Sequence, residues 1–190
     1  MNRKTGMWVS AVALCAVAVI GLREARAGGG AGDPALFKAL PSAKVSLADG
    51  IKQAGAKAPE AVTSAKFELD DKGQFSLSVY TSEKGLEVAA GDNVLKELSG
   101  SPTGAAWKPE AEVFKDAEHL KEAASQHTMM SIASVSLADV VAKAAKENKG
   151  TVFSAIPEVR RKKAVCVVLI ADGGKSTEVT YDLLTGSAIK

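Results

Sequence analysis

The chain has 190 residues, with 24 Lys and Arg against 22 Asp and Glu, which gives a formal net charge of +2. Hydrophobic residues make up 46% and charged residues 24%, fractions that exclude a disordered, collagen-like or coiled-coil protein. Aromatic residues are only 5%, so we expect a core built mainly from Ala, Val, Leu and Ile.

The N-terminus has the three parts of a secretory signal peptide. Arg3 and Lys4 precede an uncharged run of 16 residues, 7–22, and the small-residue motif Ala-Arg-Ala ends at Ala27. The run is shorter than the roughly 20 residues that span a bilayer. We therefore predict cleavage after Ala27 and a periplasmic or secreted protein. An uncleaved anchor is the alternative.

Cleavage changes what the charge and the cysteines imply. Residues 1–27 hold four basic groups and one acid, so the mature chain keeps 20 basic and 21 acidic groups, a net charge of −1. This balance gives no reason to expect nucleic acid as a partner, and no later segment could span a membrane. Cys15 leaves with the signal, so Cys166 cannot form an intramolecular disulfide, and its apolar surroundings predict a buried thiol.

Two stretches of the chain match at an offset of 90 positions. The sequence VSLAD occupies Val45–Asp49 and again Val135–Asp139, and scattered identities continue at the same offset. In each copy the serine and the aspartate three residues later predict a capping box at the start of an amphipathic helix. Three segments with strand patterns follow each helix, at 62–69, 74–81 and 86–90 and then at 152–159, 165–171 and 177–181.

The repeat predicts an α+β fold of two units, each a helix packed on a three-stranded antiparallel meander. A helix predicted at 109–126 joins the units. We divide the chain into a signal peptide, a flexible N-terminal segment, a first unit, a linker with a helix, and a second unit, at residues 1–27, 28–40, 41–98, 99–131 and 132–190.

The second unit contains SLADVVAKAAKE at residues 136–147 and ends in YDLLTGSAIK at residues 181–190. In these two motifs it resembles the PepSY domain. The first unit matches at SLADGIKQAGAKAPEAV, residues 46–62, but lacks the Thr-Gly pair after Asp92. The two copies together cover about two-thirds of the mature chain.

This resemblance implies a small, extracytoplasmic, non-catalytic module. Such modules occur in the propeptides of secreted metalloproteases, as inhibitors or chaperones, and as free-standing periplasmic proteins. We therefore expect a protein-binding module whose partner is a secreted or envelope peptidase. Two alternatives remain open at this point: a small periplasmic copper-binding protein, and a structural envelope protein that acts as a homodimer.

The sequence contains no motif for catalysis. A nucleophile elbow, a Cys–His pair and an H-E-x-x-H zinc helix are all missing from it, so we predict no enzyme, no catalytic residue and no cofactor.

Two groups of residues are candidates for binding. Both mature histidines and two methionines lie close together as His119, His127, Met129 and Met130, and thioether and imidazole ligands suit Cu(I). A solvated His119 and a methionine pair in the core are the simpler interpretation. The basic run 160–163 (Arg160, Arg161, Lys162 and Lys163) falls at a predicted hairpin turn. It could dock an acidic partner surface or only keep the hairpin edge soluble.

Overall fold

The computed structural model describes residues 33–58, 60–70 and 72–189. The predicted signal peptide and its cleavage point after Ala27 lie outside these residues. Among the described residues, no helix is both long and apolar enough to cross a membrane.

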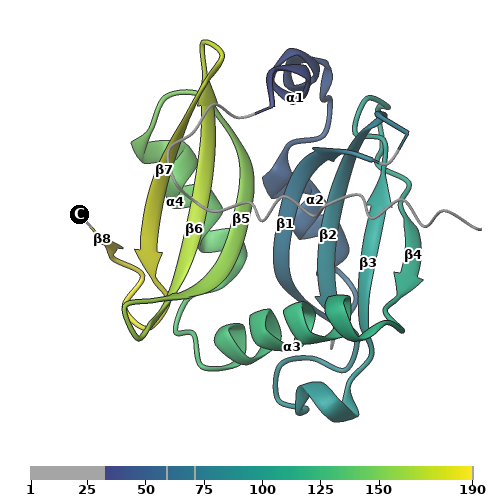
Figure 1. Ribbon diagram of the computed structural model, residues 1–190, viewed down its shortest axis with the longest axis vertical. Coiled ribbons are helices and arrows are strands. Elements are labelled where there is room, and N and C mark those ends of the chain that lie inside the picture. The colour runs from purple at the N-terminus through teal and green to yellow at the C-terminus, as the bar shows by residue number, and fades with distance from the viewer. Residues whose placement is uncertain (1–32, 59, 71, 190) are drawn as a thin grey trace, which may run out of the picture.

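Within the described residues, eight strands form one antiparallel sheet in the order β4-β3-β2-β1-β5-β6-β7-β8 (Figure 1). Their bounds are β1 Ala61–Leu69, β2 Phe75–Ser82, β3 Leu95–Gly100, β4 Glu110–Val113, β5 Thr151–Arg160, β6 Lys163–Asp172, β7 Lys175–Asp182 and β8 Ala188–Ile189.

The helices lie on both faces of this sheet (Figure 1). Their bounds are α1 Pro34–Ala39, α2 Leu47–Ala54, α3 Ala117–Ser131 and α4 Leu137–Glu147, with short 3-10 turns at Leu40–Ser42 and Ala90–Asp92. Helices α2 and α4 pack side by side on one face, whereas α3 crosses the ends of the strands from β5 to β3 on the other.

Alternation along the strands explains which residues meet which helix. On β2, Leu77 points to α2 and lies so close to Gly50 that a Cβ there would be 2.4 Å from the leucine side chain. Ser64 of β1 points to the opposite face, where its hydroxyl donates to Gln126 of α3 at 2.5 Å. The face that carries Leu77 therefore packs against α2, while the opposite face contacts α3 through polar side chains such as Ser64.

Both predicted capping boxes are confirmed. The backbone N–H of Asp49 donates to Ser46 Oγ at 3.1 Å, and that of Asp139 donates to Ser136 Oγ at the same distance. In each case the aspartate carboxylate accepts from the serine backbone N–H in return. The two helices therefore begin at equivalent places in the sequence, with their first-turn N–H groups satisfied.

The predicted fold class of two repeated units joined by a linker helix is wrong. Strand β1 pairs with β5, with Ala65 opposite Ala155 and Lys66 opposite Ser154, so the two halves form a single sheet. One hydrophobic cluster contains residues of both halves, for example Ile51 of the first and Ile170 of the second. Pairing β1 with β5 satisfies two strand edges that separate units would leave open.

Three local predictions also fail. The segment 28–40, expected to be flexible, contains helix α1 and places Leu36 and Leu40 in the core. Residues 86–90, expected to be a strand, form a loop that the Asn93 side chain holds by donating to the carbonyl oxygens of Gly85 and Val88. The third strand of the first meander is β3, further along the chain. The helix expected at 109–126 begins only at Ala117, because residues 110–113 extend as β4 along β3.

Candidate functional site

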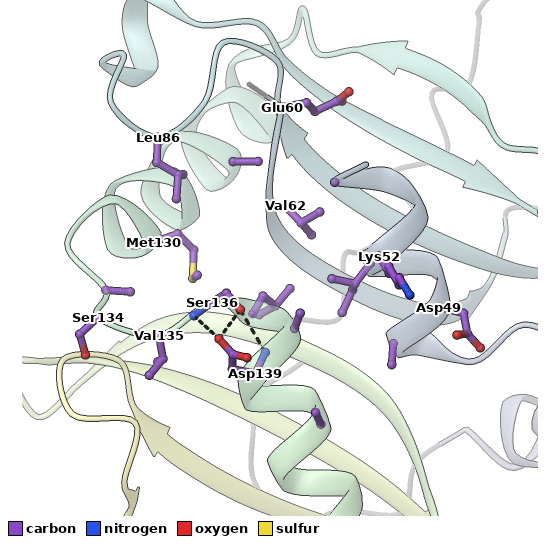
Figure 2. A pocket seen from close by; sticks show the side chains of 18 residues that line it. Asp49, Lys52, Glu60, Val62, Leu86, Met130, Ser134, Val135, Ser136 and Asp139 are labelled. Carbon is purple, nitrogen blue, oxygen red and sulfur yellow. Dashed lines mark hydrogen bonds between the residues drawn. The ribbon is translucent and has the colours of Figure 1, made fainter. Parts of the chain in front are cut away.

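A groove between α2 and α4 has a volume of about 790 Å³. This volume lies within the range of roughly 300–1,000 Å³ that is typical of binding pockets. Figure 2 shows the groove, with Lys52 of α2 and Asp139 of α4 beside it, and with Leu86 and Met130 on the side away from Lys52.

Small side chains keep the groove open. Ala48 on α2 and both Ala138 and Ala142 on α4 line it and are exposed. The apolar stripe of each helix faces the sheet, so these alanines are left on the flank where the two helices approach each other. Larger residues there would fill the space between the helices.

The floor of the groove is apolar. Ile51, Leu137 and Met130 are buried, and Val62 and Leu86 are half-buried along it. Every buried side-chain nitrogen or oxygen of the described residues has a hydrogen-bond partner. The floor therefore offers an apolar contact surface and no unpaired polar group that would select a small polar ligand.

The charged groups around the groove are mostly occupied. Asp49 and Asp139 belong to the capping boxes, and the Glu60 carboxylate accepts from Thr81 at 2.8 Å and pairs with Lys96 at 3.0 Å. Burial alone would lower the pKa of Lys96, but its bonds to Glu60 and Glu83 outweigh burial and raise it. These contacts hold the side chains of Asp49, Asp139 and Glu60 in fixed positions around the groove.

The structure places the candidate metal ligands in different environments along α3. His119 is exposed and its Nδ1 lies 2.8 Å from the Asp116 carboxylate, whose hydrogen bond outweighs desolvation and raises the pKa of the histidine. His127 is buried, with Nδ1 2.7 Å from Ser82 Oγ, and burial lowers its pKa.

The two methionines belong to the core. Met129 and Met130 are 6% and 3% exposed and pack in the main hydrophobic cluster. Two turns of helix, about 12 Å, separate the backbone positions of His119 and His127. Among the residues that the structure describes, no group of three His, Cys, Asp or Glu side chains could hold a metal ion.

The basic run 160–163 does form the β5–β6 hairpin turn. Arg161 and Lys162 occupy the turn with φ values of 50° and 65°, as a two-residue hairpin with a type I′ geometry requires. Arg160 is engaged with Glu158 at 2.9 Å and with Glu178 across the sheet. Arg161, Lys162 and Lys163 are exposed.

The buried position predicted for Cys166 is confirmed. Cys166 lies on β6 and belongs to the same hydrophobic cluster as the buried residues of α4. Burial raises the pKa of its thiol to about 12. At neutral pH the sulfur is therefore protonated and shielded, which makes it a packing residue and not a nucleophile.

Sequence reasoning missed the groove residues, although a signal was present. Both amphipathic helices place alanines beside their apolar stripes, at Ala48 and at Ala138, within the same SLAD motif. The identity of the two motifs was interpreted as a repeat of separate units. The structure instead puts the two helices next to each other and makes the alanines the walls of one groove.

Comparison with known proteins gives little further information. The chain matches no known family model and no curated protein. One solved structure is similar, the putative lipoprotein of Clostridium difficile 630. The match has 16% sequence identity, covers 78% of this chain and 92% of the other, and has a TM-score of 0.40.

Proposed function

We propose that this chain is an exported, non-catalytic binding protein that receives an apolar segment of a partner protein in the groove between α2 and α4. The observation that carries the proposal is the apolar lining of the groove, in which the half-buried Val62 and Leu86 and the exposed alanines of both helices are accessible above the buried Ile51, Leu137 and Met130. An amphipathic segment laid between two helices is a common mode of recognition.

The chemistry of the groove favours a protein partner. Apart from the exposed Lys52, its charged groups are engaged in helix caps and in the Glu60–Lys96 pair, so affinity comes mainly from burying apolar side chains. The resemblance of the C-terminal motif to PepSY modules, some of which inhibit or chaperone peptidases, makes a secreted or envelope peptidase the first partner to test. The signal-like N-terminus, residues 1–27, supports the exported location.

The test is to fill the groove without disturbing the core. Ala142→Trp places an indole in the groove, whereas Ala145→Trp adds the same side chain to an exposed position of α4 that does not line it. We expect the exported protein to bind and inhibit a peptidase secreted by the same cells, the Ala145 variant to act alike, and the Ala142 variant to lose both effects. Equal activity of the two variants would refute the role of the groove.

A further inference from the structure

Strand β4 leaves one long side of the sheet open. It is the outermost strand in the sheet order, it pairs only with β3, and all four of its residues, Glu110 to Val113, are exposed. An edge of this kind carries backbone groups that can pair with another extended chain. Many edges are protected by charge, so the chemistry of the edge decides which chain it would accept.

The register of β4 identifies which backbone groups point outward. Val113 lies opposite Lys96, so the next pair along the two strands is Phe114 opposite Leu95. The N–H of Phe114 donates to the carbonyl of Leu95 at 3.1 Å, which makes this a hydrogen-bonded pair. Because bonded and non-bonded pairs alternate in an antiparallel ladder, Glu112 and Glu110 also bond to β3. The N–H and C=O groups of Ala111 and Val113 therefore face the open edge.

The side chains of the edge are divided by charge between the two faces. Glu110 and Glu112 share a face with Glu97 of β3, since Glu112 pairs with Glu97. Ala111 and Val113 lie on the opposite face, and Val113 is 45% exposed. A strand added beside β4 would meet carboxylates at every second position and apolar groups between them.

A cavity extends this acidic face toward α3. It has a volume of about 690 Å³, and its charged and aromatic lining residues are Glu97, Glu112, Phe114, Lys115, Asp116 and His119. Phe114 stacks on Tyr80 and His119, with ring centroids 5.8 Å and 5.4 Å away. Lys66 already lies over the Tyr80 ring, with its Nζ 5.7 Å from the ring centroid. The apolar stem of a further lysine or arginine can pack against the edges of this stack while its positive head reaches the carboxylates.

The electrostatics at the centre of this face favour a positive charge. Burial is the main reason that the pKa of Glu97 is raised, and the negative charges of Glu68 and Glu112 add to the rise. A hydrogen bond from Ser78 and the positive charge of Lys66 oppose it without cancelling it. Lys66 is already paired with Glu68 at 2.6 Å. A cation brought to the edge would therefore stabilise the ionised form of Glu97.

Charge also argues against a second copy of the chain at this edge. Two β4 strands paired antiparallel would bring Glu110 and Glu112 of one copy next to the same residues of the other on one face of the sheet. Like charges directly across a strand pair are destabilising. A segment with lysine or arginine at alternate positions and apolar residues between them has the complementary pattern on both faces.

We propose that the open edge of β4 binds an extended basic segment of a partner polypeptide as a ninth strand. The outward N–H and C=O groups of Ala111 and Val113 supply main-chain hydrogen bonds, and Glu110, Glu112 and Glu97 select the positive side chains. This site lies at the edge of the sheet and is separate from the groove between α2 and α4, so it does not depend on the function proposed for the groove.

The experiment measures binding of a fluorescent seven-residue peptide that alternates lysine and valine, by anisotropy at low ionic strength, to the exported chain. Ala111→Pro removes one outward N–H while leaving the ladder to β3 intact, and we expect about tenfold weaker binding. Ala111→Ser keeps the N–H and should bind like the unchanged protein. Glu112→Lys should abolish binding, whereas Asp172→Lys, an exposed charge reversal on the β6–β7 hairpin, should not.

A peptide N-methylated at alternate residues repeats the test without altering the protein. It keeps its charge but cannot pair along a strand edge, so we expect its binding to be lost. The proposal is overturned if the unmodified peptide shows no saturable binding, if N-methylation and Ala111→Pro leave the affinity unchanged, or if Glu112→Lys weakens binding no more than Asp172→Lys does.

Discussion

Replacement of Ile170 by alanine should destabilise the whole molecule, including the half of the sheet that does not contain it. Ile170 lies on β6, is 1% exposed, and belongs to the same hydrophobic cluster as Trp107, which is 2% exposed. Removing a buried isoleucine side chain down to the methyl group costs about 3 kcal/mol, counting both the lost burial and the cavity left behind. Because all the elements that pack into the cluster should unfold together, we expect the free energy of unfolding of the whole sheet to fall by this amount.

The assay is urea unfolding followed by tryptophan fluorescence. Trp107 is the only tryptophan beyond the predicted cleavage point, and its indole N–H donates to the Gly100 carbonyl at the end of β3. With a urea dependence of about 2 kcal/mol/M, the midpoint should fall by about 1.5 M. Val159→Ala, at a position that is 65% exposed on β5, is the control and should leave the midpoint nearly unchanged.

The same experiment distinguishes one cooperative sheet from two independent units. If the account is right, circular dichroism and Trp107 fluorescence give the same urea midpoint, and in the Ile170 variant both midpoints fall by the same amount. The reasoning would be refuted if the fluorescence midpoint of the variant stayed unchanged while part of its circular dichroism signal was lost at lower urea concentrations. The region around Trp107 would then unfold independently of β6.

Three further predictions follow from individual contacts. Cys166 should react with a thiol reagent only after unfolding, since it is buried and its pKa is raised to about 12; reaction in the native protein would contradict its placement. Burial lowers the pKa of His127 beside Ser82, so the unfolded chain binds a proton more readily than the folded chain does. The free energy of unfolding should therefore fall as the pH drops below about 6.5, and it should fall less in His127→Gln. Urea midpoints measured at pH 7.5 and pH 5 for both proteins test this. Ser136→Ala removes the cap of α4 and should cost about 1 kcal/mol by thermal melting, whereas Ser125→Ala, on the exposed side of α3, should cost nearly nothing.

Local features of the sequence predicted local features of the fold. The Ser46 and Ser136 capping boxes formed because the partner of each serine lies three residues along the chain, where the helix itself brings them together. The alternation in residues 74–81 likewise predicted β2, and the unbroken apolar run in residues 165–171 predicted β6, since both patterns are properties of the strand itself.

The errors came from interactions between residues distant in sequence. Nothing in the alternation of β1 or β5 indicates that Ala65 lies opposite Ala155, although this contact decides whether there is one sheet or two. Residues 110–113 are surrounded by strong helix formers, yet they extend because β3 offers them a ladder. The groove was missed for the same reason, as it exists only where α2 meets α4.

The central functional claim is that a partner occupies the groove between α2 and α4. The most direct measurement is photo-crosslinking in the producing cells, with a photoreactive amino acid placed at position 142 or at position 145 of the exported chain. Ala142 lines the groove, and Ala145 lies on the same helix outside it. The account predicts one specific crosslinked protein from position 142, none from position 145, and loss of the product when Ala138→Trp fills the groove. Equal labelling from both positions, or a product from position 142 that survives Ala138→Trp, would contradict it.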